Sequence, residues 1–259
     1  MTLTDTHTHL YYPDFKIDVD KMMRQAMQRG ITRFFLPNVD SESIPLMYDV
    51  HQKYPNTTFM MMGLHPCSVK ENVEEELAIC LKELNSLSFV GIGEIGIDLY
   101  WDKTFLKQQQ DAFATQINWA IDRDLPFVIH SRNAFEETFE VLDSVRQSKN
   151  NIKYRGIFHC FSGTIKHAER AIEMGLHLGV GGVVTFKNSG LDKIVEAIDL
   201  KHIVLETDAP YLAPNPFRGK VNMPEYLYYI AEHVAMLKQM HIKQVAEITT
   251  ENSMIIFGK

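Results

Sequence analysis

Short apolar runs recur along the chain at intervals of roughly 20 to 35 residues, and polar segments separate them. Runs of this length that end at polar residues or glycine indicate buried β-strands. We predict eight such strands: Leu3–His9, Ile31–Pro37, Thr58–Leu64, Phe89–Ile95, Pro126–His130, Gly156–His159, His177–Gly181 and His202–Glu206.

The segments between these runs have the periodicity of amphipathic helices. Apolar residues fall on one helical face in Gln110–Ile121 and again in Glu225–Leu237. Gly30 and Gly175 directly precede two of the predicted strands, at positions typical of helix C-caps. The pattern therefore predicts a regular alternation of strands and helices.

Eight strands that alternate with helices over 259 residues predict an α/β fold, the TIM (β/α)8 barrel. No linker or repeat divides the chain, so we expect a single domain over residues 1–259. A doubly wound open sheet is the structural alternative. Such sheets usually carry a glycine-rich loop after the first strand, and His7-Thr8-His9-Leu10 is not one.

Polar residues that can bind metals or transfer protons stand at the ends of six predicted strands. In a TIM barrel, catalytic residues occupy the C-terminal ends of the strands. His7 and His9 are two positions apart, so in a strand both would lie on the same face. The whole set comprises His7 and His9, His65, Glu94, His130, His159, and the pair Glu206 and Asp208.

This set fits a centre of two divalent cations that share a water and lower its pKa. The first site would consist of His7, His9, Glu94 and Asp208, and the second of His130 and His159 with Glu94 as the bridge. Histidine-rich ligands suit Zn, Mn or Fe, whereas an all-oxygen site is more typical of Mg. The residues therefore predict two divalent cations per chain without fixing the metal.

Two carboxylates near this centre have separate expected roles. Asp208 is the candidate general base that takes a proton from the water. Glu206 alternates with Asp208 along the predicted strand, and we expect it to orient a ligand histidine rather than bind the metal.

Composition narrows the functional classes. A formal net charge of −7 argues against a protein that coats nucleic acid by bulk charge. Three widely spaced cysteines form no disulfide framework, which favours a reducing compartment. Neither a signal peptide nor a membrane-spanning run is visible, so we expect a cytoplasmic protein that needs no membrane and no obligatory protein partner.

The motifs at the strand ends resemble those of the TatD family of metal-dependent deoxyribonucleases, within the metal-dependent hydrolase superfamily. The matching segments are Asp5–Leu10, Gly63–Pro66, Gly93–Asp98, Pro126–Arg132, Phe158–Gly163 and Glu206–Pro214, followed by Arg218–Lys220 and the closing helix at Asn252–Phe257. The resemblance implies a TIM barrel, hydrolysis of phosphodiester bonds in DNA by an exonuclease, and activity with Mg or Mn. Together with the histidine-rich ligands, it makes Mg, Mn or Zn the expected cations. We expect single-stranded ends to be preferred.

Three departures from the family pattern concern the substrate more than the hydrolysis. Cys67 stands where the family often has a second histidine, Asn133 where it often has aspartate, and Val221–Pro224 replaces a more polar stretch. A hydrolase of another ester or amide, such as an aminoacyl-tRNA ester or a small metabolite, is therefore the alternative. A third possibility is a metal-containing scaffold that binds nucleic acid without cleaving it.

Loops after the strands offer candidate substrate contacts. Arg132 and Arg218 are expected to hold phosphates, and His65 to contact the same region. Further cations in these loops are Lys103, Lys107, Lys166, Lys187 and Lys220. The aromatic residues Tyr100, Trp101 and Phe105 either stack on an unpaired base or pack against the barrel rim. Cys160 is expected to point away from His159 and to pack.

Overall fold

The computed structural model describes residues 1–12 and 18–259. Its eight strands form one parallel sheet in chain order, β1 to β8. They are β1 Leu3–Asp5, β2 Ile31–Pro37, β3 Thr58–Met62, β4 Gly91–Asp98, β5 Phe127–Arg132, β6 Gly156–Phe158, β7 Leu176–Val180 and β8 Ile203–Leu205. Backbone hydrogen bonds just past β1 and β8 join the first strand to the last, because Thr6 N donates to Leu205 O (3.1 Å) and Asp208 N to His7 O (2.9 Å).

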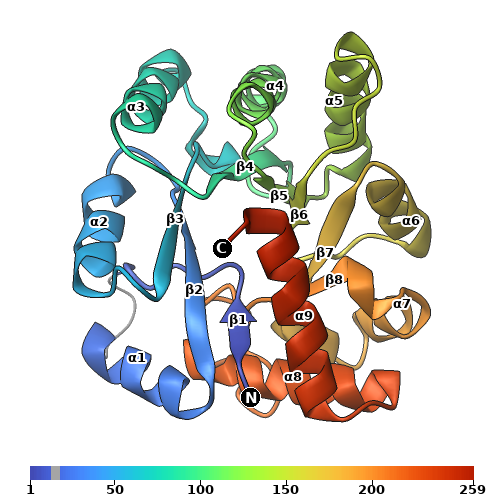
Figure 1. The fold of residues 1–259 in the computed structure, drawn as a ribbon. Helices are drawn as coiled ribbons and strands as arrows, with labels where there is room; N and C mark the ends of the chain where they lie inside the picture. Colours follow the sequence, from blue (N-terminus) through green and yellow to red (C-terminus); the bar gives the residue numbers. More distant parts are fainter. Residues whose placement is uncertain (13–17) are drawn as a thin grey trace.

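Helices surround the strands (Figure 1). They are α1 Val19–Gln28, α2 Ser43–Lys53, α3 Val73–Ser86, α4 Leu106–Asp122, α5 Phe135–Ser148, α6 Ile165–Glu173, α7 Leu191–Ala197, α8 Leu227–Lys238 and α9 Ile242–Phe257, with short 3₁₀ turns at Pro66–Ser68, Gly182–Thr185, Leu200–His202 and Pro224–Tyr226. The chain therefore adopts the predicted TIM barrel. Among the described residues, no helix combines the length and apolar character that crossing a membrane requires.

The barrel interior is filled from one end by the last helix. Buried side chains from β2, β3, β5, β6 and β8 form one cluster with Ile256 and Phe257 of α9. The rings of Phe257 and Phe35 pack with centroids 4.1 Å apart. Asn252 of α9 donates to the carbonyls of Leu200 and Ile203, at the start of β8. This end is therefore plugged, and Figure 1 shows the C-terminus within the ring of strands.

Both predicted C-cap glycines end helices. Gly30 follows α1 with a φ of +87°, and Gly175 follows α6 with a φ of +96°. A side chain at Gly30 would place its Cβ 2.4 Å from the carbonyl oxygen of Met1. Glycine is required there both by the left-handed backbone and by the close approach of the chain.

Several element bounds differ from the prediction, and three of the differences matter for the site. The strands β1 and β8 end at Asp5 and Leu205, so the residues that follow them lie in irregular segments. By contrast, β4 begins two residues later than the predicted Phe89–Ile95 and continues to Asp98. Its pairing with β5 shifts between Ile92 and Ile95, which marks a bulge in the stretch that contains Glu94.

The predicted helices are longer or divided. The segment Gln110–Ile121 lies within α4, which begins at Leu106. The segment Glu225–Leu237 splits into a 3₁₀ turn at Pro224–Tyr226 and the helix α8.

Candidate metal centre

A cavity of about 660 Å³ opens at the C-terminal ends of the strands, opposite the end that α9 plugs. Five of the six predicted metal ligands line it, namely His9, Glu94, His130, His159 and Asp208. His7 is fully buried directly behind them. The six predicted ligands, from five different strand ends, thus meet in one place.

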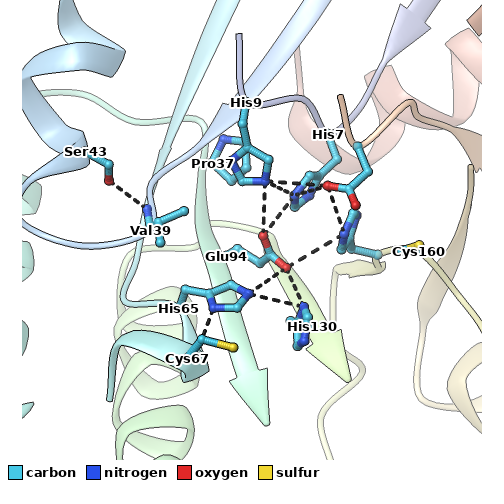
Figure 2. Close-up of polar contacts among 12 residues, drawn as sticks. His7, His9, Pro37, Val39, Ser43, His65, Cys67, Glu94, His130 and Cys160 are labelled. Carbon is cyan, nitrogen blue, oxygen red and sulfur yellow. Dashed lines mark hydrogen bonds and ion pairs between the residues drawn. The ribbon is translucent and has the colours of Figure 1, made fainter. Parts of the chain in front are cut away.

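Glu94 lies at the centre of this group, between His7 and His9 on one side and His65 and His130 on the other (Figure 2). Its Oε2 is 3.0 Å from His7 Nε2 and 3.6 Å from His9 Nε2. Its Oε1 is 2.8 Å from His130 Nδ1 and 3.3 Å from His65 Nε2. The two oxygens of one carboxylate therefore face two different sets of nitrogens.

Asp208 completes the set on the Oε2 side. Its Oδ1 is 3.6 Å from His9 Nε2, 3.7 Å from His159 Nε2 and 4.0 Å from His7 Nε2. The residue is 8% exposed, so its carboxylate borders the cavity. Its φ of 56° places it in the left-handed region, where aspartate and asparagine are tolerated.

The donor atoms fit divalent cations. Among the described residues, four groups have ligand atoms close enough together to hold an ion: His7, Glu94 and His159; His7, His9 and Asp208; His65, Glu94 and His130; and His159, Cys160 and Glu206. Imidazole nitrogens face each other at 3.3 Å in the pairs His7–His9 and His65–His130. Converging nitrogens and carboxylate oxygens in a buried cavity are the donor set of Zn- or Mn-type sites.

The grouping differs in one respect from the expected pairing of His130 with His159. The ring of His159 stacks on His7 with centroids 3.4 Å apart, and its Nε2 lies 3.8 Å from Glu94 Oε1. His65 instead lies beside His130. His159 therefore lies between the group around Glu94 Oε2 and the group around Glu94 Oε1, and it is within reach of both.

Burial and charge set the protonation states of the carboxylates. Burial alone would raise the pKa of Glu94, but His65, His7 and His159 outweigh it and hold the pKa well below its usual range. Burial is likewise outweighed at Asp208, where His159 and His9 lower the pKa of the carboxyl. Both carboxylates are therefore ionised at neutral pH.

The histidines divide into two kinds. Burial lowers the pKa of His7 to about 4, and His159 adds to this effect. At His159, burial is outweighed by Glu206 and Glu94, which raise the pKa to about 10. At His130, hydrogen bonds to Asp98 and Glu94 outweigh burial and raise the pKa to about 9. Without a cation, His130 and His159 hold protons, so binding a cation there requires proton release.

Two of the predicted ligand histidines have a carboxylate partner on the ring nitrogen that faces away from the cluster. His159 Nδ1 lies 2.9 Å from Glu206 Oε1, and His130 Nε2 lies 2.8 Å from Asp98 Oδ2. Such partners fix the tautomer and ring orientation of a metal-binding histidine. The buried Glu206 thus lies where the predicted orienting role requires it, and that role stays a prediction.

His65 differs from these histidines because its protonated ring nitrogen, rather than its lone pair, faces the cluster. Its Nδ1 accepts a hydrogen bond of 3.0 Å from the backbone N–H of Cys67, so the neutral ring carries its proton on Nε2. That nitrogen faces Glu94 Oε1. His65 is therefore arranged as a donor to a carboxylate or to a substrate oxygen, rather than as a ligand.

Two arginines that the sequence proposes for substrate lie in different places. Arg132 is exposed and lines the cavity beside His130. Arg218 is not among the described residues that line it, and its guanidinium lies over the ring of Phe186 at 4.4 Å. The predicted loop lysines are likewise absent from the described cavity lining. Arg132 is thus the candidate phosphate contact that the structure brings to the centre.

Three arguments from strand alternation are wrong. His7 and His9 lie beyond β1, and their rings meet edge to face at 73° rather than side by side on one strand face. Glu206 and Asp208 lie beyond β8, so alternation along a strand does not set their directions; they approach His159 at opposite ring nitrogens, Nδ1 and Nε2. Cys160, with a φ of 43°, lines the cavity instead of packing away from it.

Sequence reasoning missed three residues that support the cluster. Asp98 is the last residue of β4, four positions after Glu94. An acidic residue at a strand end, at an even spacing from Glu94, was a usable signal of a role at the site. Asp5 accepts hydrogen bonds from Thr207 N (2.9 Å) and Oγ1 (2.6 Å) and so joins the two chain segments that carry the ligands. Burial outweighs these bonds and raises the pKa of Asp5 to about 8. No local pattern marks Asp5 as different from any strand-end aspartate.

The third missed residue is Tyr11, which fixes the tautomer of His9. The hydroxyl of Tyr11 donates to the carbonyl of Pro37, so it must accept from His9 Nδ1, 2.9 Å away. His9 then carries its proton on Nδ1 and presents the lone pair of Nε2 to His7, Glu94 and Asp208.

We expect Tyr11→Phe to weaken metal binding by about 10–100-fold, because a ligand histidine loses its orienting partner. Titration calorimetry with Mn or Zn measures this loss. Tyr54→Phe is the matched control, since it removes a hydroxyl bonded to Asp20 (2.6 Å) far from the cavity. Equal metal affinity in wild type and Tyr11→Phe would remove the positioning role.

The comparisons with known proteins agree with this geometry. A family model described as TatD related DNase matches residues 4–258. The "uncharacterized metal-dependent hydrolase YabD" of Bacillus subtilis is 35% identical, over 98% of this chain and 98% of that protein. The "uncharacterized metal-dependent hydrolase BU355" of Buchnera aphidicola is 33% identical over the full length of both. The crystal structure of YjjV, a TatD homologue from Escherichia coli, superposes with a TM-score of 0.88 and 28% identity, covering 99% and 98% of the two chains.

Proposed function

This chain belongs to the family of TatD-related DNases and is a metal-dependent hydrolase, and from that premise we propose that it hydrolyses phosphodiester bonds in DNA. It would act as an exonuclease on single-stranded ends. One observation carries the proposal: the two oxygens of Glu94 face two groups of histidines at the base of a cavity that Arg132 also lines. A centre for two cations beside an exposed guanidinium is well suited to phosphodiester hydrolysis, because the cations can activate water and the guanidinium can bind a phosphate.

We propose the division of ligands that the sequence predicts, with His159 placed where it can reach either group. His7, His9, Glu94 and Asp208 would hold one cation, and Glu94, His130 and His159 the other. When bound, the cations supply Lewis acidity, which lowers the pKa of water and offsets the negative charge of the phosphate. The donor set suits Mn or Zn, and the family resemblance extends this to Mg.

The protein's own groups would carry out the remaining steps. Asp208 borders the cavity and is ionised at neutral pH, so it can accept the proton of the attacking water. His65 presents its Nε2 proton toward the same space and can donate it to a phosphate oxygen. Arg132 has paired N–H groups that fit two phosphate oxygens.

Net negative charge does not oppose this assignment. The exposed guanidinium of Arg132 lies at the cavity itself, and charge near the site steers a phosphate more than charge far away. An acidic surface elsewhere instead disfavours nonspecific coating of DNA.

The test is hydrolysis of end-labelled oligonucleotides by purified protein supplied with Mg, Mn or Zn. We expect a ladder of products that shortens from one end, with single strands cleaved faster than blunt duplexes. An Asp208→Asn preparation, purified in parallel, controls for contaminating nucleases. Failure to cleave DNA with any of these metals would overturn the proposal and favour a small ester or amide substrate.

A further inference from the structure

An exposed aromatic pair stands beside Arg132 at the rim of the cavity. Tyr100 is 52% exposed and Trp101 is 71% exposed, and their rings meet at 90° with centroids 4.8 Å apart. The Arg132 guanidinium lies 3.9 Å from the centre of the Tyr100 ring and 5.6 Å from that of Trp101. Exposing so much aromatic surface at the mouth of a cavity is typical of a binding surface.

The structure separates this pair from Phe105, the third aromatic residue of the same loop. Phe105 is partly buried against the main core, and the Lys70 ammonium lies 5.3 Å from the centre of its ring. Phe105 therefore packs, whereas Trp101 lines the cavity. The sequence left open whether these aromatic residues stack on a base or pack against the barrel rim. Phe105 packs, whereas the rings of Tyr100 and Trp101 are exposed to solvent.

The aromatic pair is tied to the candidate metal centre by one carboxylate. Asp98 Oδ1 accepts hydrogen bonds from the backbone N–H groups of Tyr100 (2.9 Å) and Trp101 (3.4 Å). Its other oxygen lies 2.8 Å from His130 Nε2. The backbone that carries the two rings is thereby held close to His130, as a subsite next to the reacting phosphate would require.

We propose that Trp101, Tyr100 and Arg132 form a subsite for an unpaired nucleobase and its adjoining phosphate, next to the bond that is cut. This rests on the proposed function and names the feature of DNA that the site selects. The face of Arg132 is engaged by Tyr100, which leaves its edge N–H groups for phosphate oxygens. The exposed indole of Trp101 offers a face on which any base can stack.

Selection of single-stranded ends follows from this geometry. In a duplex, interior bases are covered on both faces and a terminal base is held by its pairing partner, so a base must unpair before it can lie on the indole while its phosphate reaches Arg132. An unpaired terminal base needs no such step. Stacking on an aromatic side chain accepts every base, so the subsite would recognise strand ends with little sequence preference.

Fluorescence tests the contact directly. The chain has two tryptophans, Trp101 and Trp119, so Trp119→Phe leaves Trp101 as the single reporter. Combined with Asp208→Asn and supplied with Mn, this protein should bind DNA without cutting it. We expect a single-stranded octanucleotide to quench the emission, and the same strand with abasic residues at both ends to quench it much less. Equal effects of the two strands would overturn the stacking contact.

Kinetics then separate this proposal from the proposed function. Trp101→Ala should raise the KM for single-stranded DNA about tenfold with little change in kcat, and Trp101→Phe should restore it. Trp101→Ala should change the KM far less for strands with abasic ends. Trp119→Phe is the matched control and should leave the KM unchanged. An unchanged KM in Trp101→Ala, with DNA still cleaved, would overturn the subsite alone. Absence of DNA cleavage by the wild type would overturn the proposed function.

Discussion

Asp208→Asn is expected to lower kcat by about 10²–10⁴-fold while leaving the fold and much of the metal binding in place. Asparagine retains one oxygen at the ligand position but cannot accept the proton of the attacking water. The carboxyl is ionised at neutral pH because His159 and His9 outweigh the effect of burial on its pKa. Steady-state kinetics on a single-stranded oligonucleotide, with bound metal measured on the same samples, check the prediction.

The backbone at Asp208 makes asparagine the right substitution. The residue has a φ of 56°, a left-handed conformation that asparagine adopts more readily than most other residues. Loss of activity through misfolding is therefore not expected, and thermal melting should confirm this. Asp111→Asn, on the outer helix α4, is the matched control and should keep full activity. Normal turnover by Asp208→Asn would remove this residue as the base.

The fold was predictable because the barrel leaves a regular imprint on the sequence. Strands buried on both faces appear as short apolar runs, and the covering helices show their own periodicity between them. For Ile31–Pro37 the predicted and observed strands coincide. The strand ends were less predictable, because the chain around His7 and Asp208 leaves regular strand geometry while backbone hydrogen bonds to its neighbours continue.

The bulge in β4 shows why a pattern of alternation fails at the site. One extra residue between Ile92 and Ile95 shifts the register with β5, and the strand continues to Asp98. A period of two cannot reveal such an insertion, since the stretch is apolar or glycine on both sides of Glu94. Glu94, within this stretch, is the residue that occupies the centre of the cluster.

The identity of the cluster was predictable, but its supporting contacts were not. Residue types and their positions at strand ends suffice to collect Glu94 and the histidines, because parallel strands in a barrel converge at one mouth. The Tyr11–His9 contact and the contact between Asp98 and His130 depend on side-chain direction in irregular segments. Such directions come from the three-dimensional path of the chain, which the sequence pattern does not specify.

Glu94→Gln is expected to remove cations from both sites at once, with more than about 100-fold loss of affinity at each and loss of hydrolysis. This exceeds the roughly 10–100-fold effect of changing a residue that only orients a ligand. The reason is geometric, because Oε2 faces His7 at 3.0 Å and Oε1 faces His130 at 2.8 Å. Glutamine keeps the shape but offers one oxygen, and its amide nitrogen would face imidazole nitrogens without a lone pair to offer.

Metal content after desalting, followed by calorimetric titration with Mn, measures the outcome for Glu94→Gln. Glu136→Gln is the matched control, since Glu136 also contacts a histidine, His167 at 3.1 Å, on the surface outside the cavity. It should bind metal like the wild type. His9→Ala, in contrast, should weaken chiefly the site that His9 shares with Asp208. If Glu94→Gln lost only one cation and kept the other at full affinity, Glu94 would not be the bridge. The pair of histidines near the N-terminus would then belong to a site independent of His130.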